Sequence, residues 1–155
     1  MSFEIKRGDL FANTEGHIVH GCNAQGVMGG GVAKIVRDMY PKAYEVYHRH
    51  CADGYARLGQ VIPVCVAPNL IIHNAITQDK FGSDKVYVDY EAVRAALLAV
   101  EDYVEAAVQS EPSLSTDVHF PFIGAGLGGG DENRLLCIFE DVFGGSNISA
   151  TLWLL

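Results

Sequence analysis

The stretch HIVHGCNAQGVMGGGVAKIV, residues 17–36, decides what kind of fold this chain adopts. Its start predicts a strand over 18–22, and a glycine-rich loop follows. A helix is predicted from Gly31 to Tyr40, because apolar residues recur at helical spacing: Val32, Ile35, Val36 and Met39. A strand, a glycine loop and a helix N-terminus together favour an anion, since free backbone N–H groups and the helix dipole point toward it. Three adjacent glycines, 29–31, let a ligand lie against the main chain; the alternative is a tight turn that binds nothing.

A second glycine-rich turn, Gly124–Gly130, follows a predicted strand over Val118–Ile123. Asp131 is placed to cap the helix that comes next. The turn matches the pattern GxGxxG, but no acidic residue follows about 20 residues later, so a dinucleotide-binding fold is not indicated. In an open α/β sheet, turns of this kind leave the carboxyl edge of the strands, where ligands bind. Two such turns on one edge suggest a diphosphate held between them.

The remaining elements alternate between strands and helices through most of the chain. Strands are expected over 3–6, 60–67, 69–77 and 148–155, and helices over 41–52, from Asp89 onward, and after Asp131. Pro63 suggests that its strand lies at a sheet edge. The polar segment 78–86 is expected to be a mobile loop. The alternation predicts an α/β fold in one domain over 1–155, with three layers, α/β/α, around a mixed, mostly parallel sheet of six strands.

Composition narrows the classes of protein to consider. The chain has 155 residues, and 49% of them are hydrophobic, which is typical of a globular domain. Its net charge of -8 argues against non-specific binding to nucleic acid, which needs clustered Lys and Arg. The four cysteines form no CxxC pair, which is typical of free thiols in a reducing compartment. With no membrane-spanning run, we expect a cytoplasmic monomer.

Three side chains near the loops are candidates for binding or chemistry. Asp9 lies in Gly8-Asp9-Leu10-Phe11, where it either caps a turn or accepts hydrogen bonds from a ligand. Asn23 ends the second strand, where its amide either orients a ribose hydroxyl or stabilises the turn. His20 lies just before the first loop, and it either serves the site or packs in the core. Cys22 has no acid or base partner assignable by spacing, so we expect a buried, inert thiol.

Neither a metal site nor a cofactor is expected. His48, His50 and Cys51 are grouped in sequence, but residues two apart on a helix point away from one another. The isolated strand histidines, His17, His73 and His119, are expected to be structural or exposed.

These motifs resemble the macrodomain family, whose members bind ADP-ribose, and the resemblance covers nearly the whole chain. The similar segments are an early motif at 8–11, a first ligand loop at 20–26 with 29–33, a second ligand loop at 121–127, and a closing strand at 150–154. The first loop, followed by Tyr40-Pro41-Lys42-Ala43, is most similar to the branch that includes ADP-ribose-1''-phosphate phosphatases.

The resemblance implies a place for each part of the ligand. It implies that Asp9, followed by Leu10, contacts the adenine. It implies that Asn23 and the first-loop amides lie near the distal ribose, and that second-loop amides surround the diphosphate; the loop residues are Gly29, Gly30, Gly31, Val32, Ile123, Gly124, Ala125, Gly126, Leu127 and Gly128. His20 matches a histidine linked to catalysis in the phosphatases. Terminal-ADP-ribose glycohydrolases carry a Lys and an Asp where this chain has Gln78 and Gly128, so a lysyl-adduct mechanism is not implied.

Three functions are compatible with this resemblance. The first is a phosphatase that removes the terminal phosphate of ADP-ribose-1''-phosphate, with His20 as nucleophile or general acid/base and Asn23 orienting the ribose. The second is a module that binds ADP-ribose, or a related nucleotide, without chemistry. The third is hydrolysis of ADP-ribose from a modified protein or nucleic acid. In each case the expected partner is ADP-ribose or its 1''-phosphate.

Overall fold

The computed structural model describes residues 2–82 and 84–154, and six strands form one sheet within this range. The strands are β1 (Ser2–Arg7), β2 (Gly16–Asn23), β3 (Val61–Ala67), β4 (Leu70–Gln78), β5 (Asp117–Phe120) and β6 (Ser149–Leu154). Their order is β1-β6-β5-β2-β4-β3, in which only β3 is antiparallel to its neighbour. The predicted mixed, mostly parallel sheet is therefore confirmed, with Pro63 in an edge strand. Leu155, in the last predicted strand, and Ser83, in the predicted loop, lie outside the described residues.

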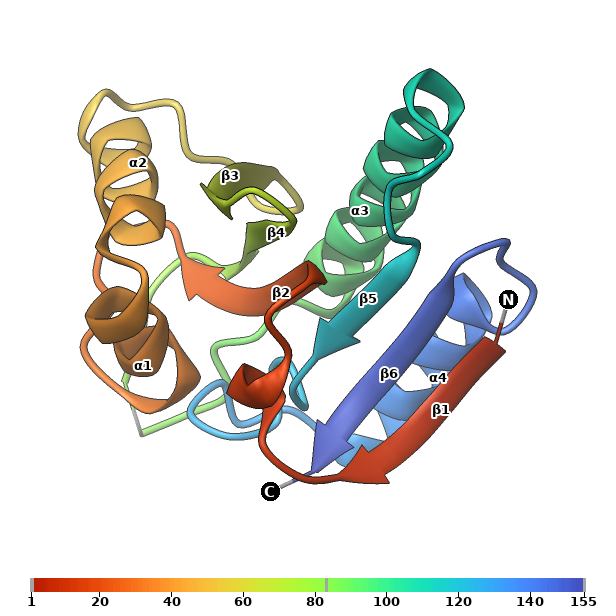
Figure 1. Cartoon of the computed structure of the whole chain (residues 1–155). Coiled ribbons are helices and arrows are strands. Elements are labelled where there is room, and N and C mark those ends of the chain that lie inside the picture. The colour runs from red at the N-terminus through yellow and green to blue at the C-terminus, as the bar shows by residue number, and fades with distance from the viewer. Residues whose placement is uncertain (1, 83, 155) are drawn as a thin grey trace.

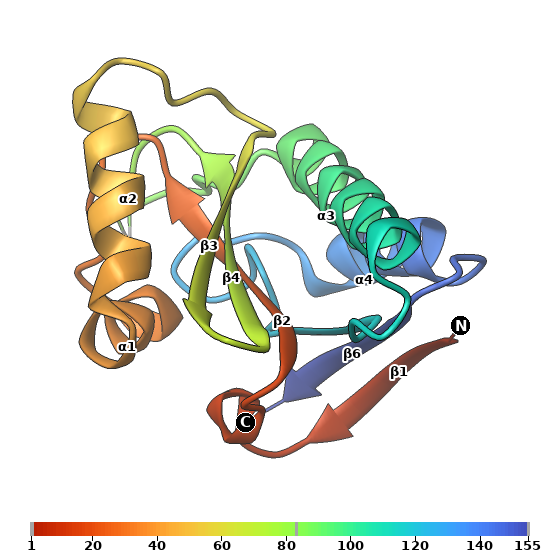
Figure 2. The same cartoon turned by 45° about the horizontal axis from the view of Figure 1, so that its top comes forward.

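Helices cover the sheet on two sides (Figures 1 and 2). The helices α1 (Gly31–Met39) and α2 (Pro41–Ala52) lie on one face, and α3 (Tyr90–Ser110) and α4 (Glu132–Phe143) lie on the other. Each face has its own apolar core. Ile18 enters the core under α1 and α2, and its neighbour Val19 enters the core under α3 and α4, because successive side chains of a strand point to opposite faces.

Aspartates begin the two helices that were predicted to follow them. Asp89 accepts a hydrogen bond from the N–H of Ala92, and Asp131 accepts hydrogen bonds from the N–H groups of Asn133 and Arg134. The apolar residues that recur at helical spacing along α4 are all buried: Leu135, Ile138, Phe139, Val142 and Phe143. The caps and the periodicity therefore fix both the start and the orientation of this helix.

Three details of the sequence-based expectation are wrong. Apolar residues recur at helical spacing along 41–52, which predicts that Val46 lies on the inner face of α2, but Val46 is 39% exposed. The reason is that α2 packs against β3, the edge strand, so only a narrow stripe with Ala43 and Tyr47 is buried. Ile35 and Met39 are likewise exposed on α1. The strand expected over 118–123 ends at Phe120, because Pro121 has no N–H to continue the ladder.

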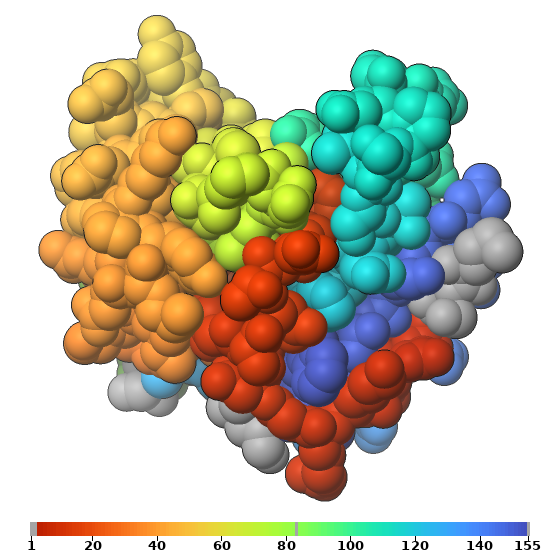
Figure 3. Space-filling model, viewed as in Figure 1, coloured from red at the N-terminus to blue at the C-terminus, as the bar shows by residue number. Residues whose placement is uncertain are grey.

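The parallel strands all end at one edge of the sheet, and this edge positions the candidate site. At this edge β1, β5, β2 and β4 each lead into a different loop. A space-filling view shows α2 and α3 as two ridges with β3 and β4 in the hollow between them (Figure 3). Within the described residues, no helix is long and apolar enough to cross a membrane.

Candidate functional site

Two glycine loops meet at the carboxyl edge of the sheet. Loop 1 (residues 24–30) follows β2, and loop 2 (residues 121–131) follows β5, which is the parallel neighbour of β2. The side chain of Leu127 lies over loop 1, because a Cβ atom placed on Gly30 would be 3.1 Å from its Cδ1. Figure 1 shows the two loops converging below α1. The prediction that both glycine turns share one edge is confirmed.

The N-terminus of α1 is free to receive an anion. Its cap residue is Gly30, no side chain caps it, and its first turn has no acidic residue. The helices α3 and α4 differ, because each has an aspartate cap and a glutamate in its first turn. Gly31 has a φ of +59°, a left-handed conformation that favours glycine at the point where the loop turns into the helix. Loop 1 and the start of α1 therefore present backbone N–H groups and the positive end of a helix dipole. No acidic side chain in the first turn of α1 neutralises this positive charge.

Loop 2 presents amides of its own. It is held by backbone bonds in which Ala125 donates to Phe122, Gly129 to Gly126, and Gly130 to Gly124. The N–H groups of 126–128 have no acceptor among the described residues. A Cβ atom on Gly126 would meet nothing within 4 Å, so a ligand can approach the main chain closely there. Consecutive free amides in a turn form a concave site for an anion.

Asn23, the last residue of β2, stabilises loop 1 through its side chain. Its side-chain oxygen accepts hydrogen bonds from the N–H groups of Gln25 and Val27, at 2.9 and 3.4 Å. Its amide nitrogen donates to the Val27 carbonyl at 2.9 Å. The turn-stabilising role that the sequence left open is thus present in the structure. The second hydrogen of this amide nitrogen has no acceptor among the described residues.

Asp9 lies at the same edge, three strands away from loop 1. It caps a single 3-10 turn, Leu10–Ala12, by accepting a hydrogen bond from the Phe11 N–H at 2.9 Å. The Asp9 residue is exposed, whereas Leu10 is almost fully buried. Three strand spacings separate β1 from β2, about 14 Å in all, so Asp9 and loop 1 bracket an extended ligand rather than a compact one.

His20 is an interior residue. Its side chain is fully buried, and its Nε2 lies 2.6 Å from Oδ1 of Asn74, which makes Nε2–H the donor. The sulfur of Cys22 lies beside the ring, 3.6 Å from Nε2 and 3.8 Å from Nδ1. Burial lowers the pKa of His20 to about 4, so the ring is neutral near pH 7. With both nitrogens engaged inside the protein, this placement corresponds to the core role that the sequence left open, and it leaves no ring nitrogen for a substrate.

Several residues around loop 1 were not assigned to this site from the sequence. The Tyr47 hydroxyl and the His48 ring of α2 both contact the loop, as described below. The backbone carbonyl of Asp79 accepts a hydrogen bond from the Ala24 N–H, and the Gln25 side chain also donates to Asp79. For Tyr47, the only indication in the sequence was that the residue is a tyrosine, because a buried tyrosine hydroxyl requires a hydrogen-bond partner.

The other histidines have separate partners. His48 and His50 contact the Gly26 carbonyl and the Gln60 side chain respectively, so they point to different neighbours as predicted. His17 and His73 form a buried pair, with 2.9 Å between their nearest ring nitrogens. His119 accepts a hydrogen bond from the Trp153 indole N–H. Within residues 2–82 and 84–154, no group of three or more His, Cys, Asp or Glu side chains is placed to hold a metal ion.

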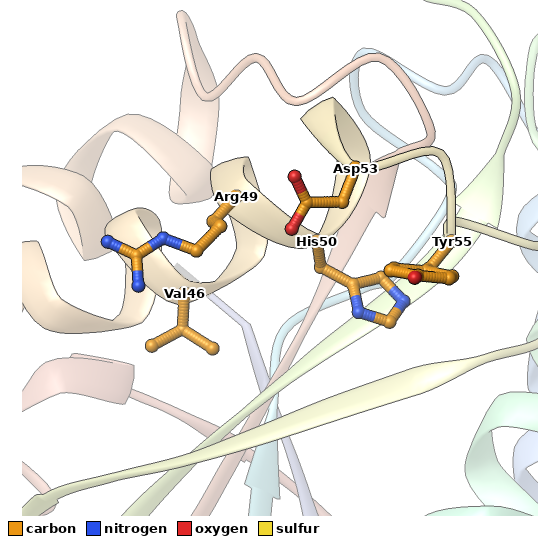
Figure 4. Close-up of a pocket in the computed structure, with 5 residues that line it drawn as sticks. All are labelled: Val46, Arg49, His50, Asp53 and Tyr55. Carbon is orange, nitrogen blue, oxygen red and sulfur yellow. The ribbon is translucent and has the colours of Figure 1, made fainter.

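A surface hollow on α2 belongs to a different part of the molecule. It is lined by Val46, Arg49, His50, Asp53 and Tyr55 (Figure 4). None of these residues belongs to loop 1 or loop 2. The candidate site is therefore defined by the two glycine loops and not by this hollow.

The sequence and the fold both match known proteins. A family model described as Macro domain matches residues 19–138. The chain belongs to the macrodomain family. This macrodomain is 47% identical over 125 residues to a protein of Scheffersomyces stipitis named ADP-ribose 1''-phosphate phosphatase. The match covers 70% of this chain and 72% of that protein. The six-stranded sheet and its four helices are also those of a solved macrodomain protein from Streptomyces coelicolor, with a TM-score of 0.79 at 29% identity over 99% of both chains.

Some relatives match only a short segment of this macrodomain. A protein of Aspergillus oryzae, also named ADP-ribose 1''-phosphate phosphatase, is 48% identical over 46 residues. This match covers 29% of this chain and 23% of that protein. The chain thus spans about a quarter of the length of that relative.

Proposed function

We propose that this macrodomain binds ADP-ribose between loop 1 and loop 2 and removes the terminal phosphate of ADP-ribose-1''-phosphate. The observation that carries the proposal is the uncapped N-terminus of α1, beside which Leu127 of loop 2 lies, together with the unpaired amides of loop 2. Two sets of backbone donors on one edge suit the two phosphates of a diphosphate. The phosphatase name of the Scheffersomyces stipitis relative supports the choice of reaction.

The ligand would lie along the carboxyl edge from β1 to β2. Asp9 would accept hydrogen bonds from the adenine amino group, and the amides of loops 1 and 2 would hold the diphosphate. The free amide hydrogen of Asn23 would orient a hydroxyl of the distal ribose. This order follows the order of the strands along the edge, in which β1, β5 and β2 carry Asp9, loop 2 and loop 1.

Hydrolysis would then depend on preorganised backbone donors. Water attacks the phosphorus atom, the bond from phosphorus to the 1'' oxygen breaks, and a proton of the water ends on that oxygen. The products are ADP-ribose and inorganic phosphate. Loop amides that are fixed before the reaction stabilise the negative charge that develops on the transferring group. In this mechanism His20 holds the end of β2 in place through Asn74, and it does not touch the substrate.

A phosphate-release assay with ADP-ribose-1''-phosphate tests the activity. We expect equal amounts of inorganic phosphate and ADP-ribose from the purified protein.

The buried state of both His20 nitrogens also favours a second function, a module that binds ADP-ribose without chemistry. Tight binding with no product over long incubation would establish this second function and contradict the first. Release of ADP-ribose from a modified protein, with no phosphate, would indicate a hydrolase of macromolecular ADP-ribose.

The variant His20→Gln separates the two possible roles of His20. The glutamine amide can donate to Asn74, but it cannot act as a nucleophile or transfer a proton near pH 7. We expect His20→Gln to keep turnover at the same order of magnitude as the unmodified protein, with thermal unfolding as the check that the variant is folded. Loss of all turnover in a folded variant with normal ADP-ribose affinity would return His20 to the mechanism.

A further inference from the structure

The helix α2 contacts loop 1 through a buried hydroxyl. The Tyr47 side chain is fully buried, and its oxygen lies 2.7 Å from the backbone carbonyl of Asn23 and 2.9 Å from the side-chain oxygen of the same residue. Tyrosine has a single O–H, so this one hydrogen is shared between the two oxygens of Asn23. Burial raises the pKa of Tyr47, which keeps the hydroxyl protonated and a donor.

The Tyr47 contact acts on the residue that organises the loop. The Asn23 side chain receives the N–H groups of Gln25 and Val27 and donates to the Val27 carbonyl, so its rotamer sets the path of loop 1. The hydroxyl of Tyr47, which lies 24 residues further along the chain, donates to the same Oδ1 atom of Asn23. Without this hydroxyl, the Asn23 amide loses a partner that does not belong to the loop itself.

The next residue of α2 holds the middle of the loop. The Nδ1 atom of His48 lies 2.9 Å from the carbonyl oxygen of Gly26 and therefore donates to it. The His48 ring stacks on Tyr44, with 5.3 Å between ring centroids, and the guanidinium of Arg37 lies 4.1 Å from the centre of the Tyr44 ring. Arg37 belongs to α1, so these stacked groups connect the two helices to the loop that runs between β2 and α1.

We propose that Tyr47 and His48 are positioning residues that hold loop 1 in the shape that receives the distal part of the ligand. The inference rests on the proposed function for the identity of the ligand. Neither residue contacts the ligand: Tyr47 acts through Asn23, and His48 acts through Gly26. Their effect is therefore specific to the end of the ligand that loop 1 holds, and the adenine end near Asp9 is independent of them.

Two ligands of different length test this specificity. In Tyr47→Phe the ring and its packing remain, and only the hydroxyl is lost. We expect ADP-ribose affinity to fall about fivefold, the size of one hydrogen bond of about 1 kcal/mol. The affinity for AMP, which lacks the distal ribose, is expected to remain within about twofold of the unmodified protein. Tyr55→Phe is the matched control, because the Tyr55 side chain is 63% exposed and lies outside loop 1.

A rescue pair tests His48 in the same titrations. His48→Ala is expected to reduce ADP-ribose affinity, and His48→Gln, whose amide can still donate to the Gly26 carbonyl, is expected to restore most of it. An equal loss of AMP and ADP-ribose affinity in Tyr47→Phe would overturn the proposal, because it would indicate general damage to the fold. Unchanged ADP-ribose affinity would overturn it as well.

A measurement without ligand separates this inference from the proposed function. Amide hydrogen exchange of Gln25 and Val27, whose N–H groups bind Asn23, is expected to be faster in Tyr47→Phe than in the unmodified protein. If the unmodified protein binds neither nucleotide, the proposed function fails, and the exchange rates still decide whether Tyr47 holds the loop. Unchanged exchange of both amides would contradict the positioning role.

Discussion

Gly126→Val is expected to lower ADP-ribose affinity about 100-fold or more, which is about 3 kcal/mol of binding free energy. The reason is that the side chain would occupy the open space beside the free amides of loop 2, where a Cβ atom meets nothing within 4 Å. The ligand would then lose two or more hydrogen bonds from backbone N–H to charged phosphate oxygens, at about 1.5 kcal/mol or more each. Isothermal titration calorimetry of the variant and the unmodified protein measures the difference.

The matched control for this variant is Gly145→Val. Gly145 follows α4, and a Cβ atom there also meets nothing within 4 Å. Both substitutions therefore place a new side chain in open space, and neither is expected to change the unfolding temperature by more than a few degrees. Only Gly126→Val is expected to impair binding. Equal ADP-ribose affinity in the two variants would show that the ligand does not approach the backbone of loop 2.

Acid is expected to destabilise the fold between pH 6.5 and about pH 4, because three histidines are buried in their neutral form. Burial lowers the pKa of His20 to about 4 and of His73 to about 3, and it also lowers the pKa of His17. Between the folded and unfolded pKa values, the unfolded chain binds more protons, so the free energy of unfolding decreases as pH falls. Each strongly shifted histidine would remove about 3 kcal/mol or more at pH 4, out of a typical total of about 5–15 kcal/mol.

Urea unfolding at pH 7, 6 and 5 measures this dependence. The variant His73→Phe keeps a ring against Tyr103, which contacts His73 edge-on, and it removes a titrating group whose Nδ1 is buried without a partner among the described residues. We expect its stability to depend less steeply on pH. Val46→Ala, on the exposed side of α2, removes no titrating group, and this control is expected to keep the original slope. A free energy of unfolding that does not change from pH 7 to pH 5 would contradict the neutral buried state of these histidines.

The fold could be predicted from local signals to a large extent. The apolar periodicity and the aspartate caps defined α3 and α4, and Pro63 correctly indicated an edge strand. One error, the strand expected to continue past Phe120, is local and follows from Pro121, but the others depend on neighbours distant in sequence. Val46 is exposed because α2 covers the edge of the sheet, and the pattern of α2 alone does not contain this information. The His17–His73 pair joins residues 56 positions apart, so no spacing rule could find it.

The candidate site shows the same division between local and distant signals. The two glycine loops are visible in the sequence because glycine content and strand ends are local features. The sequence left the role of His20 open, since proximity in sequence to loop 1 does not reveal that the side chain points inward to Asn74. The contact between Tyr47 and Asn23 depends on how α2 packs on the sheet, which only the three-dimensional structure defines.

The central claim is that loops 1 and 2 bind one diphosphate together. The most direct measurement is a two-dimensional amide NMR titration of the unmodified protein with ADP-ribose. We predict that the amides of Gly29–Val32 in and after loop 1 and those of Gly124–Gly128 in loop 2 shift together, with the same dissociation constant. Shifts confined to one of the two loops, or no shifts in either, would contradict the account.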